Sequence, residues 1–384
     1  MEKKNTLYFN NQKLLVFFTC ICWLSAKLIS WKVWGKERLF PTLPVSDLLY
    51  IIPAWFHTLL FFVSIAMLVM IMFYPKKRTL LIILLISELA ACLLDQNRWQ
   101  PWEYQYIFTI SVFIFCKDRE QIKALLSFIL IATYFFSGLH KLNNGFLYNM
   151  WDKMILSSFF NLNDQVIHHQ PAIYYFGYLL GSVECISGFL LLFKRTRKVV
   201  VYVLIVMHLF ILFILGPFGL NYNKVVLPWN MLMIGWLYVL YIREITIDMS
   251  FSFLWKGWGK MVILAWGIFP LLSFFGYWDN FLSGSIYSGN SPFLSICIKD
   301  DSKIPELQPY LERIDYNKIC DGDRLLYVQN WGMQEMQIVS YPEMRAYKKF
   351  KEQWIKKYPL VNARFYLIYF TDSTNNKIEL PSGK

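Results

Sequence analysis

A histidine and a lysine stand side by side at the point where a long apolar stretch ends. The segment SGLHKLNNGF, residues 137–146, follows the apolar run 124–136 and contains His140 and Lys141. An amine acts as a base near neutral pH when an apolar environment favours its uncharged form, so Lys141 is a candidate general base. Two ordinary roles compete with this one. A lysine at a helix end can reach the polar boundary or offset the helix dipole, and His140 beside it fits an interfacial position.

Two further ionisable residues, Glu184 and His208, lie inside apolar stretches. Glu184 is about ten residues before the basic cluster at Lys194, and His208 is about ten residues beyond Lys198. At a rise of about 1.5 Å per residue, the two lie at nearly equal depth on consecutive antiparallel helices. An ionised carboxylate in hydrocarbon costs at least about 2.5 kcal/mol. We therefore predict that Glu184 and His208 approach one another, and a purely structural interhelical pair is the alternative to a catalytic one.

Two loop segments, DQNRWQPWEYQY (95–106) and GPFGLNYNKVVLPWN (216–230), hold most of the remaining polar and aromatic candidates. With His140, the candidate ligand-binding residues from these segments are Asp95, Trp99, Trp102, Asn221 and Asn230. Arg98 and the tryptophans equally fit an interfacial belt, and Asn223 fits a helix cap. Glu88, seven residues before Asp95, shares its helix face and extends the polar set inward. No histidine pair has the i, i+4 spacing of a metal site, so no metal is expected.

The composition identifies a membrane protein. Charged residues make up 17% of the chain and hydrophobic residues 56%, whereas soluble domains carry roughly 25% charged residues. The mean hydropathy is +0.37. Apolar runs approach the roughly 20 residues that cross a hydrocarbon core. They predict a polytopic α-helical protein with about nine transmembrane helices, at residues 13–32, 52–73, 79–95, 102–116, 122–139, 171–193, 199–216, 224–242 and 260–277.

Basic clusters orient these helices. Lys3 and Lys4 predict a cytoplasmic N-terminus. An alternating path then brings the basic clusters at 76–78, 117–123, 194–198 and 243–260 to the same side. The net charge of +12 therefore reflects membrane orientation, and no nucleic-acid partner is expected. Residues 1–277 are predicted to form the bundle, with residues 278–384 on the external side. This side is the periplasm for a bacterial inner membrane, which is the expected location, and the lumen for a eukaryotic membrane.

The segment 278–384 has ordinary polarity and predicts a small external α+β domain. PFLSICI (292–298) and ARFYLIYF (363–370) are typical of strands. IPELQPYLERI (304–314) and PEMRAYKKFKEQWIKKYP (342–359) are typical of helices. Cys297 and Cys320 lie here and can pair in an oxidising compartment. The cysteines of the apolar runs are expected to be small buried hydrophobes.

The motifs YFFSGLHKLNNGF, ECISGFLLLF, MHLF, PFGLNYN and LPWN, in this order, resemble the vitamin K-dependent gamma-carboxylase-like membrane proteins, whose bacterial members are called the horizontally transferred transmembrane (HTTM) family. The similarity spans roughly residues 10–280, with the motifs within 95–230. The resemblance implies that Lys141, in a G-x-x-K-L stretch, deprotonates a naphthoquinol (menaquinone or vitamin K hydroquinone), with Glu184 and His208 beside it. Trp102 stands where the family has a histidine, which counts against full carboxylase chemistry and leaves quinone binding.

Three functions follow as hypotheses. The first is a quinol-dependent oxygenase or carboxylase-like enzyme acting on a peptide or protein at the external face. The second is a non-catalytic scaffold or maturation factor that binds a partner protein through residues 278–384. The third, a transporter, is disfavoured because no pair of Gly/Pro-broken spans occupies corresponding positions in two halves.

Overall fold

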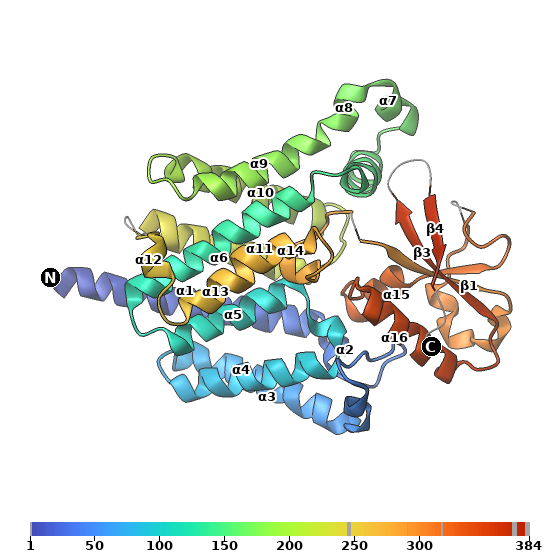
Figure 1. Cartoon of the computed structure of the whole chain (residues 1–384), viewed down its shortest axis with the longest axis horizontal. Helices are drawn as coiled ribbons and strands as arrows, with labels where there is room; N and C mark the ends of the chain where they lie inside the picture. Colours follow the sequence, from blue (N-terminus) through green and yellow to red (C-terminus); the bar gives the residue numbers. More distant parts are fainter. Residues whose placement is uncertain (1, 244–246, 290, 316–317, 371–374, 381–384) are drawn as a thin grey trace.

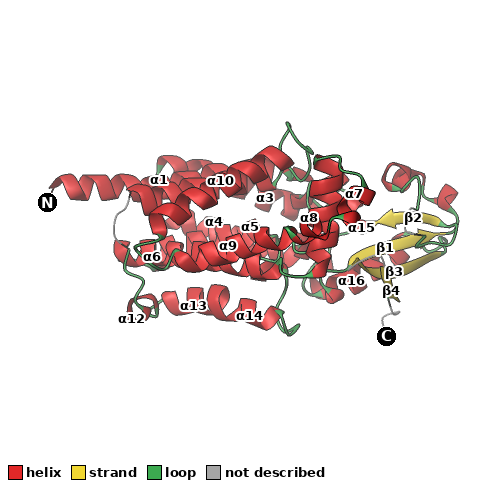
Figure 2. Cartoon of the chain, turned by 90° about the horizontal axis from the view of Figure 1, so that it is seen from above, coloured by secondary structure: helices red, strands yellow, loops and turns green. Residues whose placement is uncertain are grey.

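The computed structural model describes residues 2–243, 247–289, 291–315, 318–370 and 375–380. Most of these residues are helical. Long helices run beside one another along the long axis of the molecule, and a small sheet lies at one end (Figure 1, Figure 2). We call the end of the helical bundle next to this sheet the domain end, and the opposite end the distal end.

Six helical segments are long and apolar enough to cross a membrane, which identifies an integral membrane protein. They are Asn11–Ile29, Ala54–Phe73, Arg119–His140, Pro171–Leu190, Arg197–Leu215 and Val226–Arg243. All six coincide with predicted spans. The helices at the other three predicted spans are shorter: α4 has 17 residues, α5 has 15, and the last is Gly259–Ser273. Among the described residues the count of nine is therefore not confirmed.

Local sequence sets where helices begin. Pro101 occupies the first turn of α5, where a missing N–H costs no hydrogen bond. The Asp118 carboxylate caps α6 by accepting a hydrogen bond from the Glu120 N–H at 2.9 Å. The bundle helices are α1 (Glu2–Ile29), α3 (Ala54–Phe73), α4 (Arg78–Leu94), α5 (Pro101–Phe115), α6 (Arg119–His140), α8 (Pro171–Tyr175), α9 (Gly177–Leu190), α10 (Arg197–Leu215), α11 (Val226–Leu237) with η4 (Tyr238–Arg243), and α13 (Gly259–Ile263), η5 (Leu264–Ile268) and α14 (Phe269–Ser273).

Short elements join these helices. At the domain end they include a π-helix, η3, which follows α6 after a short turn. The connecting elements are α2 (Trp31–Trp34), η1 (Asp47–Ile51), η2 (Gln96–Arg98), η3 (Phe146–Phe159), α7 (Asp164–His169), α12 (Phe251–Leu254) and η6 (Phe281–Ser283).

The C-terminal domain is an antiparallel sheet with two helices. The strand order is β2-β1-β3-β4, and every neighbouring pair is antiparallel. One set of buried residues includes Trp331, Phe350 and Phe365, which join α15 and α16 to the sheet. The remaining elements are β1 (Phe293–Ile298), η7 (Asp301–Lys303), η8 (Pro305–Tyr310), β2 (Arg324–Tyr327), α15 (Val328–Met336), α16 (Met344–Lys357), β3 (Ala363–Phe370) and β4 (Asn375–Glu379).

Predictions for this segment hold in part. Both predicted strands are present, as is the helix at 342–359. The helix predicted at 304–314 is wrong, because Pro309 interrupts the pattern and only the 3₁₀-helix η8 forms. Cys297 and Cys320 form a disulfide. It lies in a second small apolar cluster with Leu325.

Buried hydrogen bonds fix the domain on the bundle. The Glu335 carboxylate of α15 accepts from the backbone N–H groups of Leu39 at 2.7 Å and Phe40 at 2.9 Å. The Tyr341 N–H donates to the side-chain oxygen of Asn97 at 3.2 Å. Because buried polar groups need partners, these contacts hold the domain in one orientation.

Candidate functional site

Lys141 ends α6 and faces a neighbouring helix. Its Nζ donates to Ser137 Oγ at 2.7 Å and forms an ion pair with the Glu184 carboxylate of α9. The Lys141 side chain is 13% exposed and that of Glu184 12%. Lys141 therefore does not extend to the lipid surface as an isolated interfacial cation, and the pair keeps a small accessible edge.

Glycines bring these two helices together. A Cβ atom at Gly138 of α6 would lie 2.3 Å from the backbone nitrogen of Cys185, and one at Gly188 of α9 would lie 2.6 Å from the backbone nitrogen of Phe135. Small residues at helix interfaces allow backbones in a membrane to approach closely. This close approach places Lys141 within reach of Glu184.

His208 of α10 lies in an adjacent buried network. The Asn230 amide nitrogen donates to the Val226 carbonyl at 2.8 Å, so its oxygen faces His208 Nδ1 at 2.7 Å. Nδ1 therefore carries the hydrogen. Nε2 faces the Tyr134 hydroxyl at 2.7 Å and accepts its hydrogen when the imidazole is neutral. This arrangement fixes the orientation of the imidazole between α6 and α11.

The predicted pairing of Glu184 with His208 is only partly correct. The Glu184 carboxylate is close enough to act electrostatically on His208, but no hydrogen bond or ion pair joins them in the described part of the chain. Equal depth on two helices does not set how each helix is rotated. The missed signal is on α6, where Tyr134, Ser137 and Lys141 follow i, i+3, i+7 spacing and so share one face.

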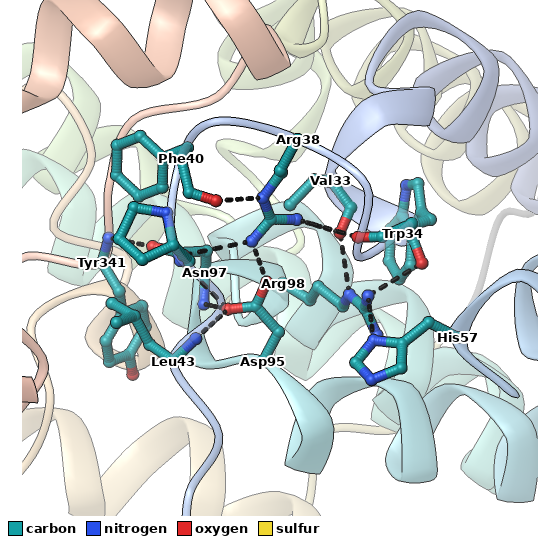
Figure 3. A network of polar contacts seen from close by, with 12 residues as sticks. Val33, Trp34, Arg38, Phe40, Leu43, His57, Asp95, Asn97, Arg98 and Tyr341 are labelled. Atoms are coloured by element: carbon teal, nitrogen blue, oxygen red, sulfur yellow. Dashed lines mark hydrogen bonds and ion pairs between the residues drawn. The ribbon is translucent and has the colours of Figure 1, made fainter. Parts of the chain in front are cut away.

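Asp95 has a structural role in a second network, shown in Figure 3, rather than facing a ligand cavity. Its carboxylate pairs with Arg38 and accepts from the Leu43 N–H at 3.1 Å and the Asn97 side chain at 3.0 Å. Burial acts to raise the pKa of Asp95, but the positive charges of Arg38 and Arg98 outweigh it, so the pKa lies below its usual value. Asp95 is thus a buried anion that organises the loop.

Arg98 is not an interfacial residue, contrary to the sequence interpretation. It is 1% exposed, and its guanidinium donates to the carbonyls of Val33 at 3.0 Å, Trp34 at 2.8 Å and Ala91 at 2.9 Å (Figure 3). A further contact at 3.0 Å joins it to His57 Nδ1. Burial lowers the pKa of Arg98 to about 10. The guanidinium supplies hydrogen bonds to the backbone carbonyls at the end of α2.

Glu88 belongs to a sealed cluster on α1, α4 and α5. Its carboxylate pairs with Lys27 at 2.7 Å, and both side chains are 0% exposed. Lys27 also lies over the Trp34 ring, 3.1 Å from its centroid. Glu103 accepts from Trp23 Nε1 at 2.7 Å and interacts electrostatically with Lys27 and Glu88. Lys27 and Glu103 were missed because nothing in a single helix pattern shows which charges face each other.

A cavity of about 660 Å³ lies between the bundle and the C-terminal domain. Its wall includes Trp102, Met150, Tyr222, Phe293 and Asn330. It falls within the size range of small-molecule sites. No acidic residue is among the described residues that line it.

The other predicted ligand residues have different positions. His140 is buried, stacks on Phe274 with ring centroids 4.3 Å apart, and contacts Ser273 Oγ at 3.2 Å. Trp99 packs edge-on against Tyr104. Asn221 is exposed and Asn230 holds His208. Asn223 does not cap α11, since its side chain donates to the Tyr287 hydroxyl at 2.6 Å.

No protein-family model, curated protein or solved structure that we compared with this chain matches it. Within the described residues, no group of three or more histidine, cysteine, aspartate or glutamate side chains is arranged to hold a metal ion. The features that bear on function are the two neighbouring networks, Lys141–Glu184 and Tyr134–His208–Asn230.

Proposed function

We propose that this protein is a membrane enzyme in which Lys141 and Glu184 together remove a proton from a naphthoquinol. The observation that carries the proposal is the ion pair itself: an amine and a carboxylate from two helices, mostly buried and with 13% and 12% of their side chains exposed. Ionisable residues inside membrane segments usually mark functional sites.

The charges of the pair suit proton removal in an apolar environment. With Lys141 as ammonium and Glu184 as carboxylate, the pair has no net charge. Glu184 takes the phenolic proton of the quinol, and the O–H bonding electrons stay on the quinol oxygen. Lys141 then lies beside the new anion, so the protonated pair and the anion are together neutral. Separated charges in a medium of low dielectric constant are avoided throughout.

The surroundings of the pair fit an apolar ring system. Leu142 follows Lys141 and is 41% exposed, and its side chain packs against Gly181 of α9. Tyr178, one turn from Gly181, donates to Asn144 Oδ1 at 2.8 Å. These side chains would contact the ring, while Lys141 and Glu184 would contact its hydroxyl. The Tyr134–His208 network lies beside them and can tune the electrostatic environment.

The proposed orientation puts the distal end in the cytoplasm. Lys76, Lys117 and Lys194 lie in connections at that end, and the positive-inside rule favours a cytoplasmic position for such clusters. The pair and the C-terminal domain would then belong to the external side, in a bacterium the periplasmic side of the inner membrane. The Cys297–Cys320 disulfide supports an oxidising compartment.

The test uses purified full-length protein with reduced menaquinone. Lys141→Met and Glu184→Gln should each lower the rate at which the quinol, with dissolved oxygen as the oxidant, is converted to the quinone epoxide and water. We expect a decrease of about 10²-fold or more, as for loss of a general base. Lys198→Met, at the distal end, is the matched control and should retain the rate. Equal rates in wild type and Lys141→Met would refute the assignment.

A second candidate function, a scaffold that binds a partner protein, is supported by the cavity of about 660 Å³ beside the C-terminal domain. Aromatic, methionine and amide side chains in its wall suit an extended peptide. In this case Lys141→Met would leave the function intact. Trp102→Ala and Phe293→Ala would instead weaken recovery of a defined partner by the full chain.

A further inference from the structure

We propose that a pocket at the distal end binds the phosphate-bearing headgroup of an anionic phospholipid. The pocket has a volume of about 270 Å³. It lies where three segments meet. These are the start of the apolar span of α1 (Asn11–Ile29), the turn between α3 and α4, and the link between α5 and α6. The pocket lies at the same depth in the membrane as the end of α3 (Phe73), the start of α4 (Arg78) and the end of α5 (Phe115). At this depth the lipid headgroups meet the hydrocarbon.

The rim of this distal pocket is basic. It carries five cationic side chains, Lys13, Lys76, Arg78, Lys117 and Arg119. No aspartate or glutamate is among the described residues lining it. Cationic groups from separate segments that converge on one cavity form a site for a phosphate, because arginine and lysine both pair with phosphate oxygens. Basic pockets between membrane helices bind anionic headgroups in this way.

The neighbouring acidic residues are engaged elsewhere. Asp118, in the same link, caps α6 through its hydrogen bond with the Glu120 N–H. The Glu120 carboxylate forms an ion pair with Lys123 at 2.8 Å. Neither carboxylate is among the described residues that line the distal pocket.

The floor of the pocket is apolar. Val16, Leu81 and Ile114 form it and are 3%, 4% and 2% exposed. Free inorganic phosphate would gain nothing from such a floor. A phospholipid presents a phosphate next to glycerol esters and acyl chains, which match a charged rim above an apolar floor. We therefore assign the pocket to a phospholipid headgroup rather than to a free anion.

A second basic group at the distal end supplies the contrast. Another hollow is lined by Lys194, Arg197 and Lys198, which all come from one short stretch of chain rather than from separate segments. The Arg197 guanidinium already donates to the carbonyls of Leu191 at 2.8 Å and Leu192 at 3.2 Å. Positive charge at this end is therefore not enough to make a site.

The test titrates the purified full-length chain, in neutral detergent, with short-chain fluorescent phosphatidylglycerol or phosphatidylcholine. The double variant Arg78→Gln/Arg119→Gln is compared with Lys194→Gln/Lys198→Gln, which removes the same net charge. At about fivefold per removed headgroup contact, the first double variant should bind phosphatidylglycerol about 25-fold more weakly. The second should change binding less than twofold, and phosphatidylcholine should bind weakly to every variant.

Three results would overturn the proposal. Equal losses in both double variants would show a response to net charge alone. Displacement of phosphatidylglycerol by millimolar inorganic phosphate would show a free-anion site. Unchanged binding in Arg78→Gln/Arg119→Gln, with an unaltered elution volume, would show that the distal pocket does not hold the headgroup. The charge-conserving Arg78→Lys/Arg119→Lys should keep most of the affinity, which separates lost binding from lost folding.

Discussion

Removal of Lys27 should be among the most destabilising single substitutions in the bundle. Its Nζ lies 2.7 Å from the Glu88 carboxylate, and both side chains are 0% exposed. At an effective dielectric constant of about 20, two unit charges at that distance attract by about 6 kcal/mol, which desolvation partly offsets. Lys27→Met leaves Glu88 buried beside Glu103 without its ion-pair partner. We expect a loss of about 3–5 kcal/mol in the free energy of unfolding.

A double-mutant cycle isolates this interaction. Glu88→Leu alone should cost a similar amount, because it leaves Lys27 buried and unpaired. Lys27→Met/Glu88→Leu removes both charges and should lie within about 1 kcal/mol of wild type, since apolar replacements of buried pairs are often neutral. Glu103→Gln is the control, because an amide oxygen can still accept from Trp23.

The assay is reversible unfolding of the purified chain in mixed micelles, followed by tryptophan fluorescence, with each free energy compared to wild type. The reasoning fails if either single substitution costs less than about 1 kcal/mol. It also fails if the double variant loses the sum of the two single losses, because the two charges would then be independent.

Three further predictions concern other parts of the chain. Gly138→Ala should separate α6 from α9 and cost about 1–3 kcal/mol in the unfolding assay, whereas Gly35→Ala, whose new Cβ meets only the Glu37 nitrogen at 4.0 Å, should have little effect. Cys297→Ser/Cys320→Ser opens a loop with a sequence separation of 23. It should lower the free energy of unfolding of the C-terminal domain by about 3 kcal/mol, measured in the full chain as faster proteolysis confined to that domain. Because the pKa of Asp95 is lowered in the folded chain, its stabilisation is present above its unfolded pKa of about 3.9 and is lost as pH falls towards the folded value. Limited proteolysis at decreasing pH should show faster cleavage of the loops around Asp95, between the bundle and the C-terminal domain, in wild type. Asp95→Asn should already show this faster cleavage at pH 7.

Hydrophobic length predicted the positions of the six long apolar helices well. The apolar run before Lys141 gave α6 within a few residues, since a buried helix of that length needs only continuous apolar sequence. Strands β1 and β3 followed from β-branched and aromatic runs. The failure at residues 304–314 has a local cause, because Pro309 leaves only short 3₁₀ geometry.

The pairing of charges could not be predicted in the same way. Lys27 and Glu88 are separated by 61 residues, and their contact depends on how two helices are rotated about their axes. Arg38 lies in a loop with no periodic pattern at all, yet it pairs with Asp95. Depth along a helix was predictable for Glu184, but its partner was decided by the glycine-mediated approach of α6 and α9.

The two lysine–glutamate pairs differ in exposure, and this difference distinguishes the structural pair from the proposed catalytic pair. Lys27 and Glu88 are sealed, at 0% each, so no ligand can reach them without opening the bundle. Lys141 and Glu184 keep an accessible edge of 13% and 12%, so water there can solvate part of a charge left unpaired. The same lysine-to-methionine change should therefore act differently at the two sites. Lys27→Met should lower stability while the quinol epoxidation rate per folded molecule is retained. Lys141→Met should lower that rate by about 10²-fold or more, with the smaller loss of stability. The reverse pattern would exchange the two roles.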